Sequence, residues 1–181
     1  MASTSFAKDL PSLYAEYGKY HTHPVNVIIH VVFVPTLLMT AMSMARHLPI
    51  GRDVTDNLWQ IHVGFVFLAL CLGLYLYLDP LGGVLACLLY IPGYALGNYL
   101  YMTMGADHLQ TIALVHACSW GVQFIGHGVF ENRRPALVDN LLLTMAAPLF
   151  VILEVVFGLG LRSALRRECH AALKKQLTKV D

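Results

Sequence analysis

Charged residues are scarce in this chain. Lysine, arginine, aspartate and glutamate make up 13% of the 181 residues, and hydrophobic residues make up 57%. A soluble domain has about 25% charged and about 45 to 50% apolar residues. The 12 basic and 11 acidic residues nearly cancel. The dense basic face of a nucleic-acid-binding protein is therefore missing, and we expect no nucleic-acid partner.

Cysteine is also rare, and the four cysteines show no paired spacing. Three of them lie inside apolar runs, where a thiol behaves as a small hydrophobic group. The four are Cys71, Cys87, Cys118 and Cys169. We therefore expect structural roles for them and no disulfide framework.

Long hydrophobic runs dominate the sequence instead, and its mean hydropathy is +0.60. Five runs are each about as long as the roughly 20 residues that cross a bilayer as a helix. They cover residues 25–45, 58–78, 81–104, 109–130 and 137–161. No alternating pattern of a membrane β-barrel is present. The sequence predicts an all-α protein, a polytopic membrane helical bundle with about five apolar helical segments in the lipid bilayer.

These runs divide the chain into three parts. Residues 1–24 form a polar N-terminal segment with the first histidines, residues 25–161 a transmembrane helical core, and residues 162–181 a basic amphipathic tail. The polar segment lacks the short basic start of a signal peptide, so we expect the first run to be retained. The tail is typical of a helix at the membrane interface, although a solvated charged tail would read the same way.

Histidines gather at two places in the sequence. If successive apolar runs cross the membrane in alternate directions, both places lie on the same side of it. His21, His23 and His30 lie at the start of the first run, and His127 and Glu131 lie at the end of the fourth. Three further histidines are expected elsewhere: His62 and His108 on the opposite side, and His116 about 16 Å from the second cluster along the helix. The two clusters can therefore build one site.

The spacing of these residues suits a metal ion. His127 and Glu131 are four residues apart, so both can reach one ion from a helical face. Pro24 favours a helix start and an extended residue before it, so the chain can bend and bring His21 back to His30. A mixture of imidazoles and carboxylate suits non-haem Fe(II), and the ligand types alone are also compatible with zinc.

There are five candidate metal ligands: His21, His30, His127, His23 and Glu131. We expect the first three also to be the catalytic residues. Either of the last two could instead orient its neighbours through a hydrogen bond, the role we expect for Asn26.

Other polar residues near the second cluster are candidates for binding a substrate. Gln123 lies one turn before the last histidine, and Arg133 and Arg134 follow it. The arginines could pair with a carboxylate or reach lipid phosphates. Glu154 lies deep in the fifth run, after Pro148, where burial demands a partner that the sequence does not identify.

Two segments carry a family resemblance. YHTHPVNVIIHVVFVP at residues 20–35 and WGVQFIGHGVFENRRPALVDN at residues 120–140 closely resemble the signature segments of the fungal 2-hydroxy fatty acid dioxygenases. The likeness runs from about Tyr14 to Leu161. The resemblance places the family histidines on His21, His30 and His127.

The resemblance implies a multi-pass enzyme of the endoplasmic reticulum membrane that takes part in phytosphingosine breakdown. Such an enzyme uses Fe(II) and O2 to cleave C1 from C2 of a long-chain 2-hydroxy fatty acid by alpha-oxidation, leaving the acid one carbon shorter. The alternatives from composition alone are a non-catalytic membrane organiser or a small transporter with structural histidines. No inverted repeat is visible, which argues against the transporter.

Overall fold

The computed structural model describes residues 9–48, 50, 61–132 and 141–178. Every regular element in these ranges is a helix, which confirms the all-helical class. The helices are α1 (Leu10–Gly18), α2 (Pro24–Met44), η1 (Ala45–His47), α3 (Val63–Leu78), α4 (Pro80–Met104), α5 (Asp107–Ile125), η2 (Gly126–Glu131), α6 (Leu141–Gly158) and α7 (Ser163–Leu177). The element η2 is a π-helix that continues α5.

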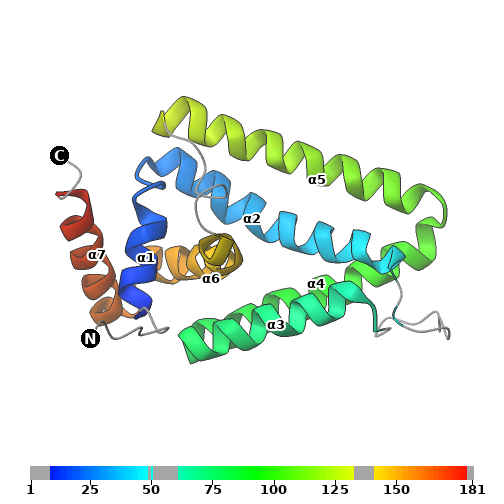
Figure 1. Ribbon diagram of the computed structural model, residues 1–181, viewed down its shortest axis with the longest axis horizontal. Helices are drawn as coiled ribbons and strands as arrows, with labels where there is room; N and C mark the ends of the chain where they lie inside the picture. The colour runs from blue at the N-terminus through cyan, green and yellow to red at the C-terminus, as the bar shows by residue number, and fades with distance from the viewer. Residues whose placement is uncertain (1–8, 49, 51–60, 133–140, 179–181) are drawn as a thin grey trace, which may run out of the picture.

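Helix α2 is the centre of the bundle (Figure 1). It contacts α3, α4, α5 and α6, and α5 lies along one side of it while α3 and α4 lie along the other. Pro24 occupies its first turn, where a missing N–H costs no hydrogen bond, and the extended residue His23 caps it. The chain turns sharply before this cap, as the position of Pro24 predicts.

The number of helices that could span a membrane is smaller than the five expected. In the described ranges, two are long and apolar enough, Pro24–His47 with 24 residues and Pro80–Met104 with 25. A third span is possible if α6 and α7, bent by 119°, are counted as one. Helix α3 has 16 residues, about 24 Å, which is short of a hydrocarbon core of about 30 Å. Helix α5 has 19 residues but carries several polar side chains, which lower its hydropathy.

The first and last helices of the described ranges, α1 and α7, pack together. Helix α1 lies within the segment expected to be simply polar, and it packs against α6 and α7 (Figure 1). It buries Leu13, Tyr14 and Tyr17, and α7 buries Cys169. The Tyr14 hydroxyl donates a hydrogen bond to the Glu154 carboxylate, which supplies the partner that the sequence left unidentified. The C-terminal segment is thus a helix packed on α1, and this packing fixes the chain that leads into the first histidine cluster.

Candidate metal centre

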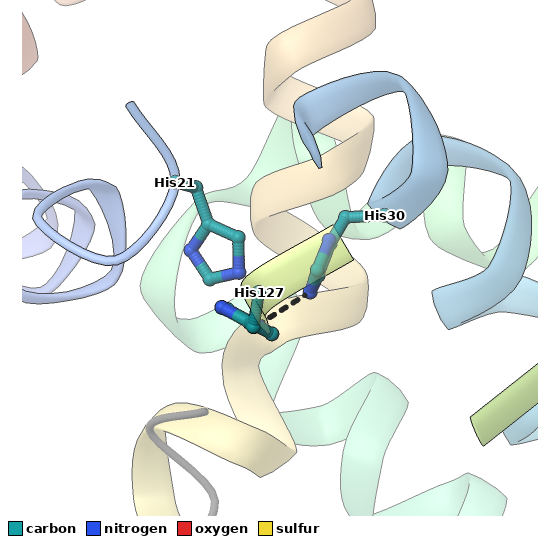
Figure 2. Close-up of side chains that lie close together, drawn as sticks. All are labelled: His21, His30 and His127. Carbon is teal, nitrogen blue, oxygen red and sulfur yellow. Dashed lines mark hydrogen bonds between the residues drawn. The ribbon is translucent and has the colours of Figure 1, made fainter. Parts of the chain in front are cut away.

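Three histidine rings from separate elements converge in the protein interior (Figure 2). His21 comes from the turn between α1 and α2, His30 from α2 and His127 from η2. One nitrogen of each ring lies within 4.8 Å of the others. The Nε2 atoms of His30 and His127 are 3.1 Å apart. The rings are only 8%, 5% and 3% exposed in chain order, so the cluster is shielded from bulk water.

Backbone carbonyls fix which nitrogen two of these rings present. The Nδ1 atom of His21 is 2.8 Å from the Tyr17 carbonyl, and Nδ1 of His30 is 2.9 Å from the Asn26 carbonyl. A carbonyl only accepts, so the ring proton in both cases is on Nδ1. The Nε2 lone pairs of His21 and His30 therefore face the cluster, in the arrangement typical of metal-ligating histidines.

The cluster fits a cation because two of its buried nitrogens lack other partners. Within the described residues, no group hydrogen-bonds Nε2 of His21 or Nδ1 of His127. Burial lowers the pKa of His21 well below its usual value, and the neighbouring His30 lowers it further. The hydrogen bond to the Tyr17 carbonyl raises this pKa but does not offset the other two effects. His21 is therefore neutral at physiological pH, and the neutral imidazole is the form that binds a metal.

A glycine lets the two main helices of the site come close. A Cβ atom at Gly126 would lie 2.5 Å from the side-chain oxygen of Asn26, far inside van der Waals contact. Asn26 is fully buried, and its amide nitrogen donates to Glu131 at 3.1 Å and to the Tyr20 carbonyl at 3.4 Å. The absence of a side chain at Gly126 thus sets the approach of η2 to α2 and with it the position of His127.

The Glu131 carboxylate is turned toward the chain before α2. It accepts hydrogen bonds from the backbone amides of Thr22 and His23 at 2.7 and 2.8 Å, and from the Thr22 hydroxyl at 2.7 Å. Burial raises its pKa, but these bonds and that from Asn26 outweigh burial, and the pKa falls below its usual value. Glu131 thus ties the turn that carries His21 to the helix that carries His127.

His23 is placed beside the cluster rather than in it. Its Nδ1 accepts a hydrogen bond from the Val25 amide at 3.2 Å, and its ring stacks on Phe130 with centroids 5.0 Å apart. In the described part of the chain, the ligand-atom group contains neither His23 nor Glu131. Asn26 supports His30 through its backbone carbonyl, and its side chain goes to Glu131.

A cavity of about 480 Å³ opens beside the three rings. Its wall is largely apolar, and most of it comes from α2, α3, α5 and α6. Its lining residues include Tyr17, Ala41, Gln123 and the three histidines. Gln123 is 4% exposed, and its side-chain oxygen has no hydrogen-bond partner in the described ranges. Arg133 and Arg134 lie outside the described residues.

His116 lies at the far end of this cavity and is fully hydrogen-bonded. The Trp120 indole N–H donates to its Nε2 at 3.1 Å, so its proton is on Nδ1, which is 2.8 Å from the Thr40 hydroxyl. This side chain links α5 to α2 and has no lone pair left for a metal.

His62 and His108 lie in separate polar contacts away from the three rings. His62 caps α3 by accepting the Gly64 amide hydrogen at 3.0 Å, and its Nε2 donates to the Asn98 side chain at 3.1 Å. Nε2 of His108 is 2.9 Å from the Ser43 hydroxyl. These contacts account for both residues as structural groups.

Tyr17 lies next to the site, and no sequence motif singled it out. Its ring stacks on His21, with centroids 3.9 Å apart and planes 16° apart, and its carbonyl fixes the His21 tautomer. It lies four residues before that histidine, at the end of α1. The recurrence of Leu13, Tyr14 and Tyr17 at helical spacing was the available signal for α1.

Comparisons with known proteins identify the family of this chain. A family model described as "2-hydroxy-palmitic acid dioxygenase Mpo1-like" matches residues 7–159. The chain is 33% identical over 167 residues to the 2-hydroxy-palmitic acid dioxygenase MPO1 of Saccharomyces cerevisiae, covering 87% of this chain and 86% of that protein. No solved structure matches the chain. The protein is thus an enzyme that belongs to the Mpo1-like family of 2-hydroxy-palmitic acid dioxygenases.

Proposed function

We propose that this protein is an Fe(II)-dependent dioxygenase that cleaves the C1–C2 bond of long-chain 2-hydroxy fatty acids. The observation that carries the proposal is the group of three buried imidazoles beside an apolar cavity of about 480 Å³. The imidazoles provide a metal site, and the cavity provides room for an alkyl chain next to it. The yeast relative is named as a dioxygenase of 2-hydroxy-palmitic acid, which is a long-chain 2-hydroxy fatty acid.

The reaction balances with O2 as the sole oxidant. The 2-hydroxy acid R–CH(OH)–COOH and O2 give R–COOH, CO2 and water. The C1–C2 bond breaks, C2 becomes the carboxyl carbon of the shorter acid, and C1 leaves as CO2. The substrate supplies all four electrons that reduce O2, so no nicotinamide or other reductant is needed.

The residues that would hold the metal are His21, His30 and His127. Three neutral imidazoles suit several divalent metals, and zinc has no redox chemistry with which to use O2, so the family reaction favours iron. Iron held there would supply the redox chemistry and the open coordination positions that O2 activation requires. Because Glu131 and His23 are engaged in other hydrogen bonds, we propose that both position the ligands.

The remaining lining residues would bind the substrate. Gln123 can donate to and accept from the hydroxy-acid head group, and its side-chain oxygen is without a partner in the described chain. Arg133 and Arg134 are also proposed for the carboxylate, although they lie outside the described residues. The apolar wall of the cavity would hold the alkyl tail and exclude water from the reacting atoms.

The setting of the reaction also belongs to the proposal. The apolar helices support an attachment to the lipid bilayer, where a long-chain acid partitions. Multi-pass insertion in the endoplasmic reticulum membrane and a role in phytosphingosine breakdown rest on the family resemblance.

The test is direct. Purified protein supplied with Fe(II), O2 and 2-hydroxypalmitate should form pentadecanoic acid, detected by mass spectrometry. His127→Ala should abolish both iron retention and product formation, whereas His47→Ala, which changes an exposed histidine away from the cluster, should leave both intact. Full activity of an iron-replete His127→Ala variant would refute the assignment.

A further inference from the structure

Tyr17 carries a polar atom that the fold does not use. Its side chain is 3% exposed, and its hydroxyl has no hydrogen-bond partner among the residues that the structure describes. A buried tyrosine hydroxyl ordinarily finds a partner, because burying it unpaired costs free energy. Phenylalanine would fill the same space without that cost. Packing alone therefore does not explain why this position carries a tyrosine rather than a phenylalanine.

The hydroxyl belongs to a residue of the cavity wall. Tyr17 lines the cavity and stacks on the His21 ring at 3.9 Å. Three other residues that line the cavity each have a buried polar atom without a partner in the described ranges: His21 at Nε2, His127 at Nδ1 and Gln123 at its side-chain oxygen. A few convergent polar groups in an otherwise apolar cavity are typical of a ligand site. Tyr17 is thus one of four lining residues whose buried polar atoms lack partners in the described structure.

We propose that Tyr17 is a substrate-binding residue whose hydroxyl donates a hydrogen bond to the carboxylate of the 2-hydroxy acid. The identity of the substrate rests on the proposed function above. A carboxylate only accepts hydrogen bonds, and in an apolar cavity it needs donors to replace water. A phenol is such a donor, and a hydrogen bond to a charged acceptor is stronger than one between neutral groups.

The stacking on His21 adds a geometric reason. The ring of Tyr17 is held on one side by His21 and on another by Phe150, with ring centroids 5.2 Å apart in the second pair. An aromatic ring fixed in this way presents its hydroxyl with little loss of side-chain freedom on binding. The phenol is therefore preorganised beside the ligand cluster.

The variant Tyr17→Phe tests this role because it keeps the ring and removes only the hydroxyl. We expect iron content to stay at the wild-type level and thermal stability to stay equal or rise, because an unpaired polar group has been removed. The KM for 2-hydroxypalmitate should rise about tenfold or more, and tenfold corresponds to about 1.4 kcal/mol.

Tyr90→Phe is the matched control. The Tyr90 hydroxyl is also buried without a partner in the described chain, but Tyr90 is not among the lining residues of the cavity. Its removal should affect stability in the same direction and leave KM unchanged. The methyl ester of 2-hydroxypalmitate is the second control, because its uncharged carbonyl is a weaker acceptor, so Tyr17→Phe should weaken binding of the ester less than binding of the acid.

The outcomes separate this proposal from the proposed function. If the wild type forms pentadecanoic acid and Tyr17→Phe has the same KM, the role of Tyr17 is refuted and the reaction stands. An equal loss with acid and methyl ester, or a loss of stability that accompanies the loss of binding, also overturns it. If the wild type forms no product, the proposed function fails, and direct binding of the acid to both forms still tests the hydroxyl.

Discussion

The variant Gly126→Ala should disrupt the proposed metal centre. The added Cβ atom would lie 2.5 Å from the Asn26 side-chain oxygen and 3.3 Å from the Ile29 side chain. Asn26 cannot turn away easily, because its amide is hydrogen-bonded to Glu131 and to the Tyr20 carbonyl. The methyl group must therefore push η2 away from α2.

The size of this movement follows from the contact distance. Ordinary van der Waals contact begins near 3.4 Å, so η2 must retreat by about 0.9 Å. Metal-ligand distances tolerate only about 0.2 Å, and a misplacement of about 1 Å can lower a rate about 100-fold. His127 directly follows Gly126 in the chain, so we expect a comparable loss of turnover and weaker iron retention.

The assay compares Gly126→Ala with Gly128→Ala. Both changes add one methyl group to the same π-helix, but within the described structure a Cβ atom at Gly128 meets no heavy atom inside 4 Å. Iron per chain and the rate of pentadecanoic acid formation should fall for the first variant and stay near wild type for the second. Equal iron content and equal rates for the two variants would refute the argument that this close approach positions His127.

Two further predictions concern the cavity and the turn before α2. Ala41 lines the cavity 11 residues after His30, about 16 Å along α2, so Ala41→Phe should block its far end and shift the preference toward shorter 2-hydroxy acids. Each methylene group that no longer fits should cost about 0.8 kcal/mol of binding free energy, which lowers the affinity about fourfold. An unchanged chain-length profile in a competition assay would show that the alkyl tail binds elsewhere. Glu131→Ala should lower the free energy of unfolding by about 1 to 2 kcal/mol and weaken iron retention, because the amides of Thr22 and His23 lose their acceptor. Thermal unfolding and metal analysis check this, and an unaltered variant would contradict it.

The meeting of His21, His30 and His127 could be predicted from the sequence. Short connections make neighbouring helices antiparallel, so the start of one apolar run and the end of another reach the same end of the bundle. Pro24 marks the bend that returns His21 to His30, and the structure contains that bend. The direction of Glu131 could not be predicted in this way. The i, i+4 rule holds for an α-helix, and the chain is a π-helix there.

The rest of the fold depends on contacts between distant parts of the chain. Helix α1 is short, and its buried face packs against α6 and α7, which lie more than a hundred residues later in the sequence. The hydrogen bond between Tyr14 and Glu154 joins residues 140 positions apart, and no local pattern pairs them. The expectation of five spans failed for a related reason. The length of an apolar run reports composition, whereas α3 has only 16 residues and α5 carries polar groups along its length.

The two main-chain carbonyls that hold Nδ1 of His21 and His30 have an evolutionary consequence. Every amino acid has the same carbonyl, so substitutions at positions 17 and 26 leave these two acceptors in place. The orientation of these two candidate ligands therefore does not depend on which side chains surround them. The cavity wall can drift toward new chain lengths or head groups while the same pair of rings stays aimed at the same point.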